Sequence, residues 1–362
     1  MIVSVLNYYY QEKKGVIIMK TRITQLFGIK YPIILPGMSW ISTPELVAAV
    51  CNAGGTGYLA TGPLTPEQTR AAINKIRELT NKPFGAGCTL IMPGARENAE
   101  VMLEERVPII NVSLGKCDWI AERAHKYGGK VIATVVTEKH ALAAEKQGAD
   151  ALQVTGHEAA AHGGQVTTFV LVPAIVDKVK IPVVAVGGIA DGRGMAAALA
   201  LGAEGIGMGT RLSMTKESPL HKKTIEAQLK AGIEDTIYSN RFDGIYCRVL
   251  KTKSAEKAIK KGMSLSHAAI QSYKIAKMMN LPYFKLVLGV MLQGPQMMIR
   301  LAHFATAFDK IKVATEDGNL EYGVQLMGQC QGLINDVPAV KDVIERTVKE
   351  AKAIYQKNLK KF

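Results

Sequence analysis

The chain of 362 residues is 48% hydrophobic and 21% charged, which is typical of a globular protein with one large domain or two ordinary ones. Its 45 Lys and Arg against 31 Asp and Glu give a formal net charge of +14, spread along the chain without interleaved aromatic residues. This pattern favours solvated basic helices over a nucleic-acid-binding surface. No apolar run approaches the roughly 20 residues that a membrane-spanning helix requires, so we expect neither nucleic acid nor membrane as a partner.

Cysteine usage indicates a reducing compartment. The cysteines are scattered, odd in number and include no CxxC pair, which argues against a disulfide framework and against a structural zinc site. The five cysteines are Cys51, Cys88, Cys117, Cys247 and Cys330. We therefore expect a cytoplasmic protein.

Residues 1–18 do not match a signal peptide. Lys13 and Lys14 interrupt two short apolar runs, and no cleavage site follows them. We expect an N-terminal extension over residues 1–18 that is irregular or lies upstream of a functional start at Met19.

From Lys20 onward, short β-rich runs alternate with longer helical ones. The β-rich runs are apolar on both faces and rich in Val and Ile, as parallel strands covered by helices are. Helices begin with a Thr-Pro-Glu pattern at Thr43 and Thr65, and others end at Gly148 and Gly202. We expect strands at 33–35, 57–59, 84–88, 109–112, 131–135, 151–154, 183–186 and 205–208. We expect helices at 44–53, 66–79, 95–105, 119–127, 138–147, 170–179, 192–201 and 219–229.

Eight βα units in about 210 residues predict a (β/α)8 TIM barrel, here over residues 19–234. A doubly wound open sheet is the alternative, and it would need fewer units. Beyond residue 234 the rhythm changes to Met-rich helical segments at 256–262, 266–279 and 285–308. We expect an α-helical cap or substrate domain over residues 235–335. Over residues 336–362 we expect a C-terminal helix, near 337–355, that packs back on the barrel.

Two glycine-rich loops follow the seventh and eighth expected strands. The seventh strand ends at Gly187-Gly188 and the eighth at Met208-Gly209-Thr210. In TIM barrels phosphate groups usually bind after these two strands, because bare glycines let backbone N–H groups approach phosphate oxygens. The loops therefore predict a phosphate-bearing ligand. Plain tight turns are the alternative.

The loop after the sixth expected strand carries two histidines, His157 and His162, with Glu158 between them. The zinc-protease motif places its histidines four residues apart on one helical face, whereas these are five apart and about 140° round a helix, so we expect no metal. We interpret His162, which lies between Ala161 and Gly163, as a general base. An imidazole with a pKa of about 6.5 can take a proton from an activated carbon. His157 is interpreted as a surface or hydrogen-bonded loop residue.

Several segments together carry a family resemblance: Gly156-x-Glu158-Ala159-x-x-His162-x-Gly164, Ala185-Val186-Gly187-Gly188-Ile189, Met208-Gly209-Thr210-Arg211, an opening Tyr31-Pro32-Ile33-Ile34 and a late Gly328-Gln329-x-x-Gly332-Leu333-Ile334-x-Asp336. As a set, over about residues 22–345, they resemble the FMN-dependent nitronate monooxygenases, formerly called 2-nitropropane dioxygenases. The FMN-dependent enoyl-acyl carrier protein reductases share this pattern, which therefore identifies the fold and the cofactor better than the substrate.

The resemblance implies a TIM barrel with a helical cap, FMN at its mouth and His162 as the catalytic base. The implied FMN contacts are Met38, Gly87, Thr155, Gly187, Gly188, Met208, Gly209 and Thr210. The implied reaction is the oxidation of an alkyl nitronate, or of a nitroalkane, by O2. The alternative is an NAD(P)H-dependent FMN reductase that acts on enoyl thioesters or quinones, with an acidic carrier protein as partner. A homodimer is compatible with either activity.

The chain departs from the family pattern at several positions. Ala160-Ala161 replace a Gly-Gly pair, Thr155 replaces a common Gln, and Gly87 stands where an Asn commonly faces the flavin. These departures bear on the contacts to the flavin ring and on the substrate, and they leave the base and the phosphate loops in place.

Overall fold

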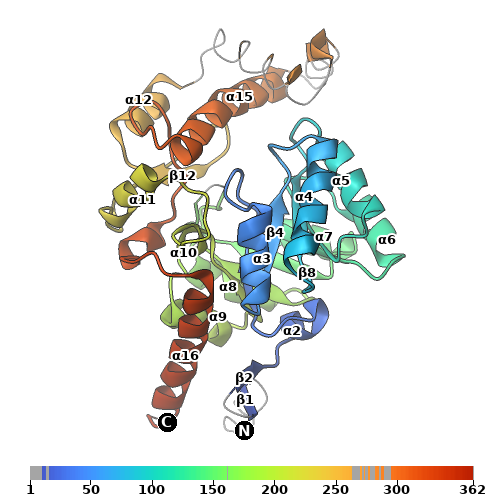
Figure 1. Cartoon of the computed structure of the whole chain (residues 1–362), viewed down its shortest axis with the longest axis vertical. Helices are drawn as coiled ribbons and strands as arrows, with labels where there is room; N and C mark the ends of the chain where they lie inside the picture. The colour runs from blue at the N-terminus through green and yellow to red at the C-terminus, as the bar shows by residue number, and fades with distance from the viewer. Residues whose placement is uncertain are drawn as a thin grey trace.

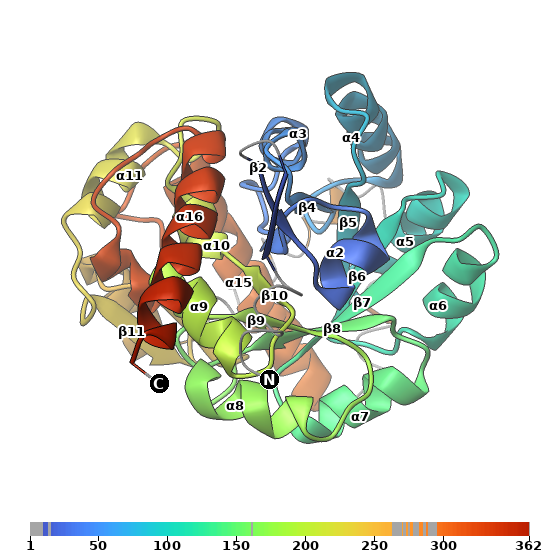
Figure 2. The ribbon, with the colours of Figure 1, turned by 90° about the horizontal axis from the view of Figure 1, so that it is seen from below.

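A computed structural model describes residues 10–13, 16–160, 162–262 and 295–361 of the chain, together with scattered positions between 263 and 294. Eight parallel strands close into a barrel in the order β10-β3-β4-β5-β6-β7-β8-β9 (Figure 2). They are β3 (Ile33–Leu35), β4 (Thr56–Ala60), β5 (Gly85–Thr89), β6 (Ile109–Ser113), β7 (Lys130–Val135), β8 (Ala151–Thr155), β9 (Val183–Val186) and β10 (Gly205–Gly207). The predicted (β/α)8 barrel is confirmed, strand by strand.

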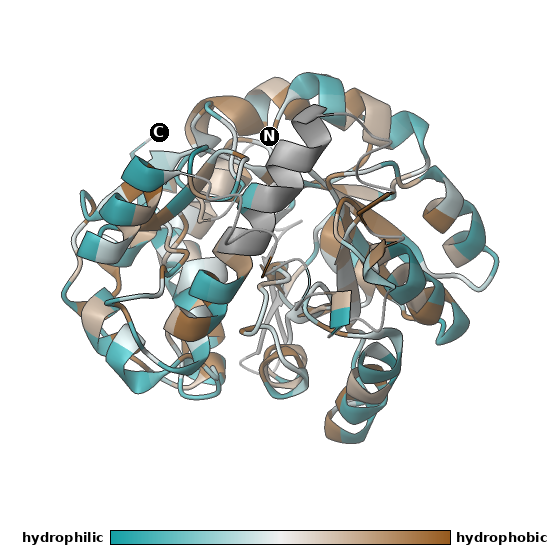
Figure 3. Ribbon diagram, turned by 90° about the horizontal axis from the view of Figure 1, so that it is seen from above, coloured by the Kyte–Doolittle hydropathy of each residue, from teal (hydrophilic) through white to brown (hydrophobic). Residues whose placement is uncertain are grey.

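A ring of helices surrounds the barrel and turns mostly hydrophilic positions to the outside (Figure 3). The helices are α3 (Pro44–Asn52), α4 (Pro66–Leu79), α5 (Ala95–Glu104), α6 (Asp118–His125), α7 (Glu138–Lys146), α8 (Thr168–Val176), α9 (Gly192–Ala200), the short α10 (Gly209–Ser213) and α11 (Lys222–Leu229). The Thr65 hydroxyl accepts a hydrogen bond from the Gln68 N–H and so forms the expected cap of α4. Helix α11 begins three residues later than predicted, because the ring of His221 caps it by accepting from the Lys223 N–H.

Two apolar cores follow from the alternation of side chains along the strands. The larger one lies between the strands and the helices, and includes Leu35, Val154 and Ala185. The smaller one fills the barrel, and includes Ile34 and Tyr58, both fully buried. The barrel core also includes side chains of α2 (Arg22–Phe27), which lies across the amino-terminal end of the barrel (Figure 2). The sequence pattern did not predict α2, because six residues are too few to show a helical period.

Two segments of the expected N-terminal extension form strands. Strands β1 (Tyr10–Lys13) and β2 (Val16–Met19) pair as an antiparallel hairpin, where an irregular segment was expected. Residues 1–9 lie outside the described part of the chain.

Helices follow the barrel, as predicted, but the cap also contains two strands that were not predicted. It contains an antiparallel ribbon of β11 (Thr236–Ser239) and β12 (Cys247–Leu250), followed by α12 (Lys253–Lys261) and the long α15 (Pro295–Glu316) (Figure 1). The ribbon contributes Ile237, Cys247 and Val249 to a third apolar cluster, together with Phe242 and residues of α12 and α15. The helix expected at 266–279 lies largely outside the described residues.

The chain ends in a 3-10 turn, η1 (Gln329–Leu333), and in α16 (Val340–Leu359). Helix α16 runs down the side of the barrel against α9 (Figure 1). The Tyr355 hydroxyl donates to the Ala196 carbonyl oxygen over 2.7 Å, and the Gly192 N–H donates to the Glu350 carboxylate over 2.8 Å. No helix in the described part of the chain combines the length and the apolar composition needed to cross a lipid bilayer.

The contact between α9 and α16 predicts a steric requirement at Gly192. A Cβ atom there would lie 2.5 Å from the Thr347 carbonyl oxygen and 2.6 Å from the Ala351 nitrogen, both backbone atoms that cannot turn away. Gly192→Ala should lower the free energy of unfolding by about 1–3 kcal/mol, measured by denaturant titration. Gly232→Ala is the control, because its Cβ would meet only Asp235, at 3.6 Å. Equal stability of the two variants would contradict the prediction.

Candidate active site

The two glycine loops leave the barrel at the same rim. Strands β9 and β10 are parallel neighbours, with Ala185 opposite Ile206 and Val186 opposite Gly207. Their carboxyl ends, which lead into the two loops, therefore lie side by side, at the end of a TIM barrel where ligands bind.

The first loop needs glycine for conformational reasons. Gly187 and Gly188 have φ angles of +110° and +77°, which residues with a side chain rarely adopt. A Cβ atom on Gly187 would also lie 2.9 Å from the Thr168 hydroxyl, and one on Gly188 would lie 3.5 Å from the side chain of Glu158. Glycine at these two positions is therefore required by the backbone conformation, and at Gly187 also by the close packing against Thr168.

The second loop brings Met38 and Gly209 together. A Cβ atom on Gly209 would lie 3.4 Å from the Met38 sulfur. The Thr210 hydroxyl is already engaged, since it accepts a hydrogen bond from the Gly328 N–H over 3.1 Å. Met208 is fully buried in the outer core and its N–H bonds the Ile34 carbonyl oxygen, so its side chain is not available to a cofactor.

The loop after β8 folds back onto its own helix. The Glu158 carboxylate accepts from the Thr168 N–H and the Thr168 hydroxyl, each over 2.9 Å, and so caps α8. This bond explains why α8 begins at Thr168, two residues earlier than predicted. Gly156 and Gly163 lie where this fold-back is tightest: a Cβ atom would collide with Thr168 in the first case and with the Gly156 carbonyl oxygen in the second.

The cap ribbon holds this loop from the other side. Arg248 donates from Nη2 to the His157 carbonyl oxygen over 2.8 Å, and the Tyr238 hydroxyl donates to the Gly163 carbonyl oxygen over 3.0 Å. The ring of His157 packs edge-on against Tyr238, with Nδ1 3.2 Å from the Gly164 carbonyl oxygen. His157 therefore has the hydrogen-bonded loop position that was expected of it.

His162 forms a charged pair with a residue that the sequence did not single out. Its Nε2 lies 2.7 Å from Oδ2 of Asp243, in the turn between β11 and β12. The Asp243 side chain is only 3% exposed and that of His162 25% exposed. Burial alone would lower the pKa of His162, but the charge of Asp243 and the hydrogen bond to it outweigh burial, so the pKa lies above its ordinary value of 6.5. Among the described residues no hydrogen bond reaches the second ring nitrogen, Nδ1.

Asp243 is the centre of a small polar cluster. Its second oxygen accepts from the Ile245 N–H over 3.1 Å. Burial raises the pKa of the Cys247 thiol, and the charge of Asp243 and a hydrogen bond to it raise that pKa further, so the thiol stays neutral. His303 of α15 is close enough for Asp243 to raise its pKa, but burial lowers that pKa more. Across the described residues, no three His, Cys, Asp or Glu side chains are grouped as a metal site.

The upper interior of the barrel is polar. Asn111 and Gln153 donate from their amide nitrogens to the Thr134 hydroxyl over 3.0 and 3.2 Å. The Gln153 Oε1 and the Thr155 hydroxyl are buried without a hydrogen-bond partner in the described structure. Leaving a buried polar group unpaired costs about 1–3 kcal/mol, so both atoms call for a partner that the chain does not supply.

The position of Gly87, where the family pattern commonly has an Asn, lies beside an Asn of the neighbouring strand. A Cβ atom on Gly87 would lie 3.4 Å from Oδ1 of Asn111, so Asn111 on the neighbouring strand occupies the space beside Gly87. Asn111 and Gln153 were not predicted as site residues. Their sequence context could have indicated them, because each is a lone amide within an otherwise apolar strand.

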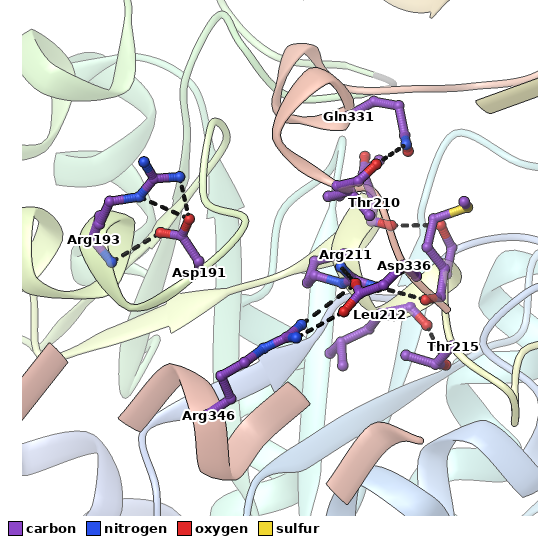
Figure 4. A network of polar contacts seen from close by, with 12 residues as sticks. Asp191, Arg193, Thr210, Arg211, Leu212, Thr215, Gln331, Asp336 and Arg346 are labelled. Carbon is purple, nitrogen blue, oxygen red and sulfur yellow. Dashed lines mark hydrogen bonds and ion pairs between the residues drawn. The ribbon is translucent and has the colours of Figure 1, made fainter. Parts of the chain in front are cut away.

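An ion-pair network surrounds Arg211, just after the second glycine loop (Figure 4). Arg211, 2% exposed, donates to Oδ1 of Asp336 over 2.7 Å and to the Met214 carbonyl oxygen over 2.6 Å. Arg346 of α16 donates to the other oxygen of Asp336 over 2.7 Å. The hydrogen bond from Arg346, followed by that from Arg211, lowers the pKa of Asp336. The network ties α10 to the C-terminal helix, and it lies behind the loop rather than in the mouth.

The loop after β3 also contacts the cap. Trp40, with a φ of +61°, packs edge-on against Phe308 of α15, with ring centroids 4.4 Å apart. Met38, two residues earlier, is thus held between the second glycine loop and a segment that the cap fixes.

The chain is similar in sequence to proteins of a known family. The chain matches a model of the nitronate monooxygenase family over residues 20–105 and 92–350. It is 34% identical over 341 residues to the (3aS,4S,5R,7aS)-5-hydroxy-7a-methyl-1-oxo-octahydro-1H-indene-4-carboxyl-CoA dehydrogenase of Mycobacterium tuberculosis, covering 92% of this chain and 96% of that protein. A probable nitronate monooxygenase of Staphylococcus aureus is 33% identical over 285 residues, which cover 66% of this chain and 80% of that protein.

Among solved structures, FabK from Thermotoga maritima superposes with a TM-score of 0.80 at 36% identity, covering 95% of this chain and all of that one. The resemblance seen in the sequence motifs is therefore confirmed. The chain belongs to the nitronate monooxygenase family and is an oxidoreductase built on a (β/α)8 barrel.

Proposed function

We propose that the protein is an FMN-dependent oxidoreductase that acts on an acyl or enoyl thioester, with His162 moving the proton at the carbon next to the thioester carbonyl. The observation that carries the proposal is the charged pair of His162 and buried Asp243 at the barrel mouth. The relatives that match this chain through its cap, a carboxyl-CoA dehydrogenase and FabK, support the substrate class.

The residues present suit FMN. Gly187, Gly188 and Gly209 offer bare backbone on adjoining loops for its phosphate. The unpartnered Gln153 Oε1 and Thr155 hydroxyl suit the edge of a flavin ring, which carries both hydrogen-bond donors and acceptors. FMN, when bound, supplies the acceptor or donor of a hydride, and the protein supplies orientation and electrostatics.

His162 has one ring nitrogen engaged by Asp243 and the other available. Asp243 fixes the ring and stabilises its protonated form, as a carboxylate does for a catalytic imidazole. A raised pKa means that His162 is protonated at neutral pH more often than an ordinary histidine. It is therefore suited to donate a proton to an enolate-like carbon when an enoyl thioester is reduced, and to accept that proton in the reverse direction.

Nitronate oxidation with O2 is the second candidate. The family model and the Staphylococcus aureus relative favour it. A protonated His162 would hold the anionic nitro group of a nitronate by charge and hydrogen bond, with no need for proton abstraction. The two candidates therefore differ in whether His162 transfers a proton or only binds an anion.

Anaerobic rapid mixing distinguishes the two candidates. FMN-loaded protein would be mixed in turn with a saturated acyl-CoA, an alkyl nitronate, NADH and NADPH, and the reduced protein with an enoyl-CoA. We expect the flavin absorbance to bleach with acyl-CoA or a reduced nicotinamide, and to recover with enoyl-CoA. Bleaching by nitronate alone would overturn the thioester assignment and select the second candidate.

The charged pair predicts a pH effect. Because the pKa of His162 is raised in the folded protein, the pair stabilises the fold fully below pH 6.5, and this contribution is lost as the pH rises through the folded-state pKa. Asp243→Asn should therefore lower Tm more at pH 6 than at pH 9. It should also lower the pKa of His162, measured by NMR of the histidine rings. An unchanged His162 pKa would contradict the pair.

Replacing the imidazole tests its role in proton transfer. His162→Gln should slow flavin reduction or reoxidation by thioester by at least about 100-fold while the protein keeps its FMN. His140→Gln is the control, because His140 is an exposed residue of α7. A rate equal to that of the control would remove His162 from the chemistry.

The glycine cradle predicts a loss of cofactor. Gly188→Val should weaken FMN binding, because valine is strained at a φ of +77° and its side chain would crowd the loop beside Glu158. Gly128→Val is the matched control, since Gly128 has a φ of +84° but a Cβ atom added there would meet nothing within 4 Å. Comparable FMN retention in two variants of similar stability, measured by flavin release on dialysis, would refute the placement.

A further inference from the structure

The turn between β11 and β12 presents an aromatic ring to solvent. Tyr246 is 42% exposed, and its ring stacks on Tyr238 with centroids 5.1 Å apart and planes 18° from parallel. Tyr238 is itself held in place by its hydroxyl bond to Gly163 and by Arg248, whose guanidinium lies 5.2 Å from the ring centroid. Tyr246 is thus an exposed ring on a rigid support.

The same turn carries an exposed cation next to others. Arg241 donates from Nη2 to the carbonyl oxygen of Lys260, over 3.1 Å, at the end of α12. Lys257 and Lys261 of α12 lie near Lys310 of α15, whose pKa is lowered first by burial and then by the charges of these two lysines. We call these five side chains the cap cation cluster: Arg241, Lys257, Lys260, Lys261 and Lys310.

The cap cation cluster is incompletely neutralised. Within the described residues, no carboxylate lies within ion-pair distance of any of its members. The nearby acids are Asp309, which raises the pKa of Lys310, and Glu256 on α12. Lysines at the end of α12 complement the helix dipole, which explains Lys260 and Lys261. Lys310 is held by Tyr322, whose carbonyl oxygen accepts from its Nζ over 2.9 Å and whose ring centroid lies 4.0 Å from that atom. Neither contact explains why Lys257 and the turn residue Arg241 gather beside these lysines.

The turn connects this surface to the candidate active site. Between Arg241 and Tyr246 lies Asp243, the partner of His162. Arg241 is close enough to the active-site side to lower the pKa of His303 of α15, although burial lowers it more. A ligand that lies over the turn would therefore reach toward the barrel mouth.

We propose that Tyr246 and the cap cation cluster bind the phosphorylated adenosine diphosphate end of a ligand. Adenine would stack on the open face of Tyr246, and the phosphates would lie against Arg241 and the lysines. Coenzyme A carries this group with its extra phosphate at the 3′ position of the ribose, and NADPH carries it with the extra phosphate at the 2′ position. The inference deepens the proposed function and rests on it for the reacting end of the ligand.

Direct binding to the FMN-loaded protein identifies the source of the group. Calorimetric titrations would use coenzyme A, dephospho-coenzyme A, NADPH, NADH and 4′-phosphopantetheine. We expect either coenzyme A or NADPH to bind about tenfold more tightly than its counterpart without the extra phosphate, with an affinity that falls as salt is added. Phosphopantetheine binding as tightly as coenzyme A, or no binding by either adenosine ligand, would overturn the proposal.

Two pairs of variants locate the site. Tyr246→Ala should weaken binding about tenfold and Tyr246→Phe less than about threefold, because stacking needs the ring and not the hydroxyl. Lys257→Ala with Lys261→Ala should weaken binding about tenfold. The charge-matched control, Lys139→Ala with Lys146→Ala on α7, removes two exposed lysines from the barrel wall.

Equal affinities in the cluster variant and the α7 control would place the ligand elsewhere. Because binding is measured without turnover, this result is independent of whether thioesters reduce the flavin. A protein that binds coenzyme A through the cluster but oxidises only nitronates would retain this inference and lose the proposed function.

Discussion

The bond between His162 and Asp243 joins the two parts of the molecule on which any chemistry at this mouth depends. The barrel contributes the imidazole, on a loop that follows β8, and the cap contributes the carboxylate, on the turn of its ribbon. Neither part alone sets the charge of the imidazole. Burial opposes the protonated form of His162, but the charge of Asp243 and the hydrogen bond to it outweigh burial and favour that form.

Other hydrogen bonds hold the loop that carries His162 in position. Glu158 caps α8 and closes the loop at one end, while Arg248 and Tyr238 hold its backbone carbonyls from the ribbon. The glycines of the loop allow this packing, since a side chain at Gly156 would collide with Thr168. Much of the conspicuous motif therefore shapes the loop, whereas the side chain of His162 pairs with the carboxylate of the cap.

The barrel could be predicted from the sequence because several βα units repeat the same local signals: an apolar run, a capped helix start or a glycine stop. The cap could not, because the ribbon of β11 and β12 is short, and its apolar positions contact helices that are distant in sequence. Asp243 lies 81 positions from His162 and belongs to no motif, so no local sequence pattern predicts that the two residues pair. Asn111 and Gln153 could have been found, since an amide inside an apolar strand needs a partner.

Under the proposed function, recognition would be divided among three surfaces with different chemistry. Buried amides in the barrel suit a planar polar ring, glycine loops at the rim suit a phosphate, and the charged pair suits a carbon acid or its anion. The first two come from the barrel, whereas the third needs the cap. Under the proposed function, a change in the cap could alter the substrate while the barrel kept the same cofactor. Relatives named as a carboxyl-CoA dehydrogenase and as a probable nitronate monooxygenase both match this chain.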